Sequence, residues 1–308
     1  MSIREQWNQK YLDFLLEGIP DYYQWEKKDD PDYYEYEVSG DTLMKILFLD
    51  WNNISCNSNI TWNLVKNNKN LPWNYDYLLT NPSITLDIIE NHIKIFNWKK
   101  ISKNPNITWK FIEQNIDKSW DWNAISLNPN INWKIIKKYI DKPWNWFYLS
   151  YHKNITWEII SNNLDKPWNW EAVSFNPNID WVIVKNNMEH PWNWDNLSSN
   201  INISIKIILD NFDKQLSWGD ISANPNLTWD FVEQNINKPW DWFELSQHEN
   251  INWDIISNNP DKPWENSWVS RNPNITIDII KNNPDFEWSW DYLSENTFEK
   301  ERNLFINR

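Results

Sequence analysis

The sequence predicts an all-α protein, an elongated α-solenoid of 24-residue repeats that each hold two short helices. Three observations predict this fold class. A segment with the consensus NPNITW recurs at nearly constant spacing, residues that cap helices stand at fixed places in each recurrence, and only 3 glycines occur among 308 residues. Self-similarity at a fixed period of this length is the signature of a repeat architecture.

Ten repeats cover residues 58–296. Successive repeats start 24 residues apart, except for one step of 23 residues, where a residue is missing from the segment 92–100. Positions in a repeat are numbered from 1 to 24, and the last residue of the short repeat, Asn104, also counts as position 24. The repeats start at Ser58, Pro82, Pro105, Pro129, Lys153, Pro177, Ile201, Pro225, Glu249 and Pro273.

A helix is predicted in the first half of each repeat. Position 4 always carries a side chain that can accept a hydrogen bond from a free N–H group at a helix start. Apolar residues follow at three- and four-residue spacing, as in Trp157, Ile160 and Leu164, and this spacing is typical of one helical face. The position-4 residues are Thr61, Thr85, Thr108, Asn132, Thr156, Asp180, Ser204, Thr228, Asn252 and Thr276.

A second helix, short enough to be a 3₁₀ turn, is predicted after position 17. Nine of the ten repeats carry a good capping residue there, and a Ser-x-Asn-Pro segment ends half of these helices because the residue before proline avoids the α region. The exception is Glu265, which is followed by asparagine at the usual tryptophan position. We therefore expect a shifted helix, started by Asn266 or Ser267, with Trp268 turned toward the usual indole pocket.

A β-solenoid is the competing fold, because isoleucine, threonine and tryptophan all favour strands. Stacked tight β-turns usually need many glycines, and the chain has only Gly18, Gly40 and Gly219. A capping residue in all ten repeats, followed by helical spacing, also has no explanation in a strand. Helices are therefore favoured.

The 27 tryptophans concentrate at positions 5, 16 and 18 of the repeat. Where position 5 lacks tryptophan, Leu86, Ile205 and Ile277 replace it, and these side chains keep the bulk but have no π face for stacking on a base or a sugar. The indoles are therefore interpreted as mainly structural, and one set is expected to form a continuous buried row. That row consists of Trp109, Trp133, Trp157 and Trp181.

No constellation of catalytic or metal-binding residues is found in the sequence. Position 22 carries serine in nine of ten repeats, which indicates a small residue between repeats with its hydroxyl bonded to the backbone, not a nucleophile. Position 24 carries asparagine in eight repeats and His152 or His248 in the other two, where a role in the turn is the interpretation. Cys56 is the single cysteine, so no intramolecular disulfide can form. We expect neither enzymatic activity nor a cofactor or metal.

The formal net charge of −14 argues against nucleic acid as a partner, because a protein that neutralises phosphates is basic on one face. It also argues against anionic membrane surfaces. No apolar run approaches the about 18 residues of a membrane span, and the first apolar stretch contains charges, unlike a signal peptide. The expected location is intracellular, in the cytoplasm.

The regions outside the ten repeats are expected to protect the ends of the array. Residues 1–40 are interpreted as a helix followed by an acidic, tyrosine-rich segment that caps the first repeat. Residues 41–57 contain a degenerate half-repeat, DWNNISCN. Residues 297–308 begin an eleventh repeat and turn polar, as the terminal cap of a solenoid must.

Two families resemble this pattern. The segments SLNPNINWKII (126–136) and SANPNLTWDFV (222–232) are similar to the leucine-rich variant repeat family, whose units also carry an Asn-Pro turn before a helix. That resemblance implies α- and 3₁₀-helices alternating in a right-handed superhelix, although the family's second proline is tryptophan here and its arginine is absent. The iron–sulfur cluster of one family member depends on cysteines that this chain lacks, so no cofactor is implied.

The second resemblance rests on the pattern DKPWNWxxLSxNPNITW, which covers nearly all of residues 50–296. This pattern resembles the Asn- and Trp-rich tandem repeat proteins of giant DNA viruses. The resemblance implies a viral origin and a location in the host cytoplasm or the viral factory, but no activity.

The predicted function is a non-enzymatic repeat scaffold for protein–protein interaction. Positions 19, 20 and 23 are mostly polar, but in the middle of the array they turn apolar together and should form one partner-binding patch, unless position 23 is half-buried between repeats. The alternatives are single-stranded nucleic-acid binding by repeated aromatics and a structural role in a virion. Neither the partner nor the oligomeric state follows from the sequence. The predicted patch consists of Ala124, Leu127, Phe147, Tyr148, Tyr151, Ala172 and Phe175.

Overall fold

The computed structural model describes residues 2–18, 49–93, 96–211 and 217–307. The chain divides into two compact bodies: a terminal body of residues 1–91 together with 265–308, and a central body of residues 92–264. The predicted acidic, tyrosine-rich cap of residues 19–40 lies outside the described residues.

No strand occurs in the described residues, so the β-solenoid alternative is wrong. Each repeat holds two short α-helices, and the second is α-helical rather than a 3₁₀ turn. The first helices are α5 (Trp62–Asn67), α7 (Leu86–Asn91), α9 (Trp109–Gln114), α11 (Trp133–Lys138), α13 (Trp157–Ser161), α15 (Trp181–Asn186), α17 (Ile205–Asn211), α19 (Trp229–Gln234), α21 (Trp253–Asn258) and α23 (Ile277–Asn282). The second helices are α6 (Tyr75–Leu78), α8 (Trp98–Ile101), α10 (Trp122–Leu127), α12 (Trp146–Ser150), α14 (Trp170–Ser174), α16 (Trp194–Ser198), α18 (Trp218–Ser222), α20 (Trp242–Gln247), α22 (Asn266–Arg271) and α24 (Trp290–Glu295).

In the described ranges, three further helices lie outside the ten repeats: α1 (Ile3–Gly18), α4 (Trp51–Cys56) and α25 (Glu299–Ile306). Among the helices of the described ranges, none combines the length and the apolar character that crossing a bilayer requires.

Side-chain caps start the helices where the sequence predicts them. In nine of the ten repeats, the position-4 oxygen accepts a hydrogen bond from the backbone N–H three residues later, for example Thr108 from Phe111 at 3.3 Å. At position 17, eight side chains cap the second helix, whereas Glu265 and Ser289 make no such bond. A capping bond is worth about 1 kcal/mol, a large contribution for helices this short.

The shift predicted for the second helix after Glu265 is wrong. Helix α22 begins at Asn266, which is position 18, the same position at which the other second helices begin. The backbone carbonyl of Glu265 accepts hydrogen bonds from the N–H groups of Trp268 and Val269, at 2.8 and 2.9 Å, so a regular first turn forms without a side-chain cap. Trp268 packs its ring against Tyr292, with the ring centroids 5.1 Å apart.

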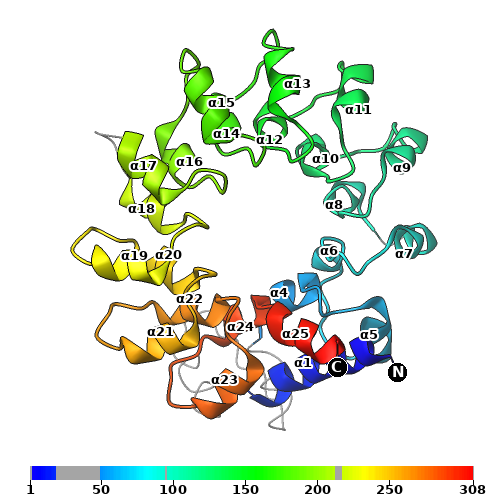
Figure 1. The fold of residues 1–308 in the computed structure, drawn as a ribbon. Coiled ribbons are helices and arrows are strands. Elements are labelled where there is room, and N and C mark those ends of the chain that lie inside the picture. Colours follow the sequence, from blue (N-terminus) through cyan, green and yellow to red (C-terminus); the bar gives the residue numbers. More distant parts are fainter. Residues whose placement is uncertain (1, 19–48, 94–95, 212–216, 308) are drawn as a thin grey trace, which may run out of the picture. The chain divides into compact units, whose positions relative to one another are not determined.

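The helices of the central body form two layers (Figure 1). The second helices from α10 to α20 pack side by side in chain order and form the concave layer, while the first helices from α9 to α19 form the convex layer. Stacking of this kind places equal positions of neighbouring repeats next to one another, which is the arrangement of an α-solenoid.

The tryptophans at position 16 fill the core. Seven of them are only 6 or 7% exposed, and Phe96 takes the same place in the short repeat with 7% exposure. Each of these indoles donates its Nε1–H to a backbone carbonyl five residues earlier, as Trp144 does to Tyr139 at 2.8 Å. The bond satisfies the single polar group of the indole where it would otherwise be desolvated.

In the central body, the tryptophans at positions 5 and 18 are half-buried rather than buried. Where the preceding repeat carries tryptophan at both positions, as for Trp144, the buried indole lies against both: Trp144 meets Trp122 edge-on at a centroid distance of 5.1 Å and Trp109 at 5.9 Å. The indoles at positions 5 and 18 cover the indole at position 16, and one side of each covering ring stays in contact with water. The prediction of a fully buried row is therefore wrong for its four members, Trp109, Trp133, Trp157 and Trp181.

The serine at position 22 joins consecutive repeats. The hydroxyl of Ser126 accepts a hydrogen bond from the N–H of Asn145 in the next repeat at 2.9 Å and donates to the carbonyl of Trp122 at 2.7 Å. The interpretation of this serine as a residue bonded to the backbone between repeats is confirmed. A hydroxyl that accepts from the next repeat recurs at Ser55, Ser102, Ser150, Ser174, Ser222 and Ser270.

The asparagine at position 24 forms a second, buried ladder. The Asn176 amide Nδ2 donates to the carbonyl of Ser150 in the preceding repeat at 2.8 Å and to that of Ile155 near the start of its own repeat at 3.1 Å. Its Oδ1 accepts from the N–H of Asn178 at 2.7 Å. Because buried backbone carbonyls need partners, the amide satisfies groups on both sides of the junction between two repeats.

Histidine at position 24 keeps one contact with the preceding repeat and the acceptor role toward the residue two places later. The His152 Nε2 lies 3.0 Å from the carbonyl oxygen of Asn128, and its Nδ1 accepts from the N–H of Asn154 at 3.1 Å, which places the proton of the neutral ring on Nε2. Burial lowers the pKa of His152 because it disfavours the charged ring. The predicted role of histidine in the turn is confirmed.

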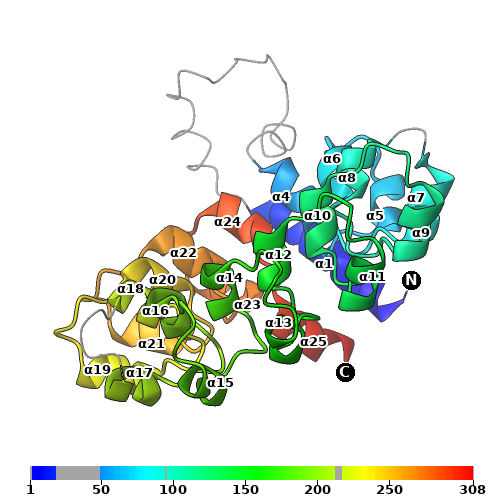
Figure 2. The ribbon, with the colours of Figure 1, turned by 90° about the horizontal axis from the view of Figure 1, so that it is seen from above.

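The half-repeat at the start of the array takes a place in the row of second helices. In the terminal body, α22, α24, α4 and α6 pack in that order, and Figure 2 shows α4 beside α24. Trp51 of α4 meets Trp73 edge-on at 5.1 Å, as position 18 meets position 16 elsewhere. Asn57 Nδ2 donates to the carbonyls of Ser294 and Asn296, at 3.0 and 3.2 Å, like a position-24 residue.

The segment 297–308 supplies the other half of the same repeat. Asn59 Nδ2 donates to the carbonyl of Thr297 at 2.9 Å, the bond that Asn130 makes to Pro105 between consecutive repeats at 3.1 Å. One repeat is thus assembled from the two ends of the chain, α25 from one and α4 from the other. Helix α1 packs against α25 and α5. Within the terminal body, the predicted C-terminal cap of residues 297–308 therefore contacts both the last repeat and the start of the first repeat.

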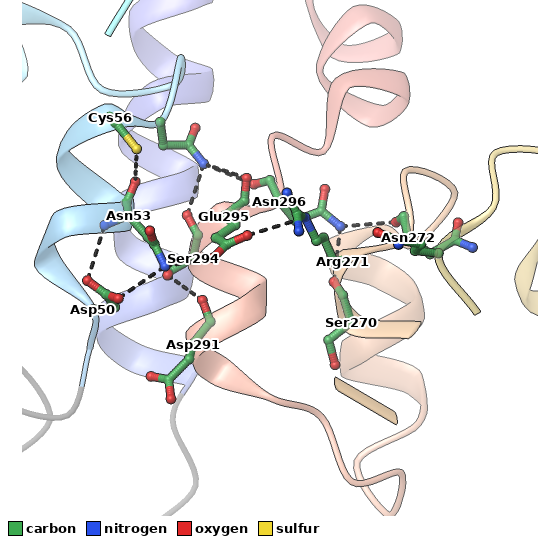
Figure 3. Close-up of polar contacts among 12 residues, drawn as sticks. Asp50, Asn53, Cys56, Ser270, Arg271, Asn272, Asp291, Ser294, Glu295 and Asn296 are labelled. Carbon is green, nitrogen blue, oxygen red and sulfur yellow. Dashed lines mark hydrogen bonds and ion pairs between the residues drawn. The ribbon is translucent and has the colours of Figure 1, made fainter. Parts of the chain in front are cut away.

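A carboxylate bridges three second helices at this junction. Glu295 at the end of α24 accepts a hydrogen bond from Asn53 of α4 at 2.8 Å and pairs with Arg271 of α22 at 3.3 Å (Figure 3). The contact is partly exposed, so it adds little stability of its own. It does connect the last residues of α22 and α24 to α4.

Candidate interaction surface

The predicted patch lies on three neighbouring second helices of the concave layer. Ala124 and Leu127 are on α10, Phe147 and Tyr148 are on α12, and Tyr151 follows α12 as its C-cap. Ala172 is on α14, and Phe175 is the C-cap of that helix. Since α10, α12 and α14 pack side by side, the structure brings all seven residues onto adjacent helices.

Six of the seven side chains reach the surface. Leu127, Phe147 and Phe175 are 41, 44 and 50% exposed. Ala124, Tyr148 and Tyr151 are half-buried. Ala172 is 2% exposed and therefore does not belong to a surface patch, because its short side chain does not emerge from between the helices. Tyr148, at the same position one repeat earlier, is long enough to do so.

Three of these residues form an aromatic cluster, defined as Phe147, Tyr148 and Tyr151. The three ring centroids lie 5.6, 5.7 and 6.1 Å apart, and all three pairs are close to perpendicular. Such edge-to-face pairs hold each ring in place. Burial raises the pKa of Tyr151, and the neighbouring Tyr148 adds to that effect, so the Tyr151 hydroxyl stays a neutral donor at physiological pH.

A groove of about 490 Å³ opens beside the aromatic cluster. Ala124 and Leu127 of α10 and Tyr148 of α12 line it, together with Lys103, Pro105 and Asp121, the N-cap of α10. The groove is lined by both apolar and polar side chains. The predicted patch did not include Lys103, which occupies position 23 and could have been found by reading that position one repeat further back.

The charges on this layer change sign from one end to the other. Lys99 and Lys103 are exposed on the side of α8, next to the groove. Glu171 and Asp195 are exposed on the side of α14 and α16. All four occupy position 19 or 23, so the same positions that are apolar in the middle of the layer are basic before it and acidic after it.

In the described ranges no three His, Cys, Asp or Glu side chains are grouped so that they could hold a metal ion. Cys56 donates its thiol to the carbonyl of Asn53 at 3.3 Å (Figure 3), and burial raises the pKa of that thiol, which lowers its thiolate fraction. Comparison with protein-family models, with curated proteins and with solved structures finds no match to this chain.

Proposed function

We propose that the chain is a repeat scaffold for protein–protein interaction, and that the concave layer of its central body binds a segment of a partner protein. The observation that supports this most is the aromatic cluster, three mutually contacting and partly exposed rings beside a groove of about 490 Å³. Aromatic side chains are enriched at protein interfaces, and contiguous exposed apolar surface marks interaction sites.

The repeat architecture suits this role. The serine and asparagine ladders hold each second helix to the next, so the surface is ordered before a partner arrives. A surface that is already ordered loses less conformational entropy on binding. Solenoids commonly use their concave side in this way.

The finer features of the proposal come from the sequence. We propose a right-handed superhelix, a cytoplasmic location and no catalytic activity, as the residue pattern and its resemblances imply. Single-stranded nucleic acid is a less favoured partner because the net charge is −14 and because exposed carboxylates, Glu171 and Asp195, flank the aromatic cluster.

Selection from a display library of random peptides tests the proposal, because it requires no named partner at the outset. The wild-type chain serves as bait, and enriched peptides are compared on the double variant Tyr148→Ala with Tyr151→Ala. A matched control is Tyr77→Ala, because Tyr77 is 41% exposed at position 20 of another repeat. Circular dichroism confirms that each variant is folded.

We expect enriched peptides that bind the wild-type chain and the Tyr77 variant equally, and bind the double variant at least about tenfold more weakly, a loss of about 1.4 kcal/mol. A selection that enriches no peptide, or only peptides indifferent to the double substitution, contradicts the proposed binding surface.

A further inference from the structure

We infer that the partner segment is an extended peptide with an acidic end, a large apolar residue in the middle and a basic end. This inference rests on the proposed function and adds the chemistry of the occupant. It follows from the order of charges along the concave layer, where Lys99 and Lys103 precede the aromatic cluster and Glu171 and Asp195 follow it.

The basic end of the surface is a local exception in an acidic protein. The chain has a net charge of −14, but two exposed lysines, Lys99 and Lys103, stand at positions 19 and 23 of the same repeat. Lys103 also lines the groove. A carboxylate of the partner placed there meets two ammonium groups. Elsewhere the overall negative charge repels it, so the charge arrangement selects both the place and the orientation of the peptide.

The middle of the surface accepts an apolar side chain. Ala124, Leu127 and Tyr148 line the groove, and the Tyr148 ring is held by Phe147 and Tyr151. A leucine or phenylalanine of the partner would bury apolar area against these groups, which is the contribution expected to dominate the affinity.

The spacing of the repeats sets the spacing of the peptide. Neighbouring packed helices lie roughly 8–10 Å apart, and an extended peptide advances about 3.3 Å per residue, so one repeat corresponds to about three residues. Lys99 in α8 and Lys103 just after it are two repeats before α12, and Glu171 is one repeat after it. The acidic residue therefore precedes the apolar one by about six residues, and the basic residue follows by about three to six.

Single-stranded nucleic acid is the competing occupant, because lysines beside aromatic rings also bind phosphates and bases. The exposed carboxylates of Glu171 and Asp195 oppose a phosphate backbone along the same path. The peptide is therefore the occupant that the charge order favours, and an oligonucleotide is one outcome of the test.

The probe is a fluorescein-labelled peptide of about 14 residues, with two glutamates, then phenylalanine and leucine about six residues later, then two lysines about five residues further. Binding is followed by fluorescence anisotropy with the full chain. Companion peptides replace the glutamates or the lysines by glutamine, and an oligothymidine of similar length tests the alternative.

We expect the charged peptide to bind the wild-type chain, and the paired substitution Lys99→Glu with Lys103→Glu to weaken it at least about tenfold, an effect that salt diminishes. The pair Glu171→Lys with Asp195→Lys should also weaken it. The control pair Lys134→Glu with Lys137→Glu, exposed on the first helix α11, makes the same change of net charge and should leave binding unchanged.

Two outcomes overturn the inference and leave the proposed function intact. In the first, library-selected peptides need Tyr148 and Tyr151, but their affinity for the variant Lys99→Glu with Lys103→Glu equals their affinity for the wild type. The other is a charged peptide that binds no better than its glutamine companions while the selected peptides still need the aromatic cluster. Oligothymidine binding that is lost in the lysine variant, together with no peptide binding, overturns both proposals.

Discussion

The side-chain amide of Asn57 donates a hydrogen bond to the backbone carbonyl of Ser294, at 3.0 Å and across 237 residues of sequence. Within continuous sequence, the same bond joins a position-24 asparagine to the serine 26 residues before it, as in Asn200 to Ser174 at 2.9 Å. The two ends of the chain therefore pack as though they were consecutive repeats. A second hydrogen bond between the two ends runs from Asn59 Nδ2 to the carbonyl of Thr297 at 2.9 Å.

Substitution of Asn57 should loosen the ends of the chain before the rest. Asn57→Ala leaves the carbonyls of Ser294 and Asn296 without this donor, at a cost of about 1–3 kcal/mol for the buried groups. We expect hydrogen exchange, followed by mass spectrometry, to accelerate selectively in α1, α4 and α25. Asn200→Ala, which removes the equivalent donor inside the continuous array, should spare these three helices. Unchanged exchange in α1 and α25 of the Asn57 variant would refute the junction.

Histidine should replace asparagine in the buried ladder at low cost, and alanine should not. Asn176→Ala removes the donor to Ser150 and Ile155 and the acceptor for Asn178, so we expect a loss of about 2–4 kcal/mol in the free energy of unfolding. Asn176→His should lose less than half of that, because His152 at the same position still bonds a carbonyl of the preceding repeat and still accepts from the N–H two residues later. Urea denaturation measures the free energy of unfolding of both variants. Equal losses would show that these hydrogen bonds are not the reason why asparagine or histidine occupies position 24.

The two kinds of tryptophan should respond differently to phenylalanine. Trp144 is 6% exposed and donates its Nε1–H to Tyr139, so Trp144→Phe should cost about 1–2 kcal/mol from the lost bond and the lost volume. Trp133 is half-buried, and Trp133→Phe should cost less than about 1 kcal/mol. Thermal unfolding of the two variants measures both losses of stability. A larger loss for Trp133→Phe than for Trp144→Phe would contradict this prediction.

Acidification should destabilise the repeat that contains His152. Burial holds the pKa of His152 in the folded chain below its value in the unfolded chain. As the pH falls below the ordinary histidine pKa, the unfolded chain takes up the proton first, so stability that is present at neutral pH is lost. His152→Asn should remove this part of the loss. Urea denaturation of both proteins at pH 7 and at about pH 5 gives the difference, and an equal loss in both would exclude a contribution from His152.

The helices and their starts could be predicted because their signals are local. A capping oxygen at position 4 acts on an N–H group three residues away, as Thr108 does on Phe111, and the apolar spacing that follows repeats every turn. The general nature of the serine and asparagine ladders could also be predicted. A polar residue that recurs at the same position of each repeat contacts the same groups of the neighbouring repeat. Lys103 was within reach of the same reasoning, because it stands at position 23, where its neighbours were already included in the patch.

By itself, the sequence determined the 24-residue period, the helix caps, the structural role of the indoles and most members of the surface patch at positions 19, 20 and 23. The tertiary structure alone decided which indoles are buried, because Trp144 and Trp109 are the same residue type and differ only in what the neighbouring repeats place over them. It also decided that the two ends meet. The bond from Asn57 to Ser294 follows no period within the chain, so only packing in three dimensions brings its two partners together.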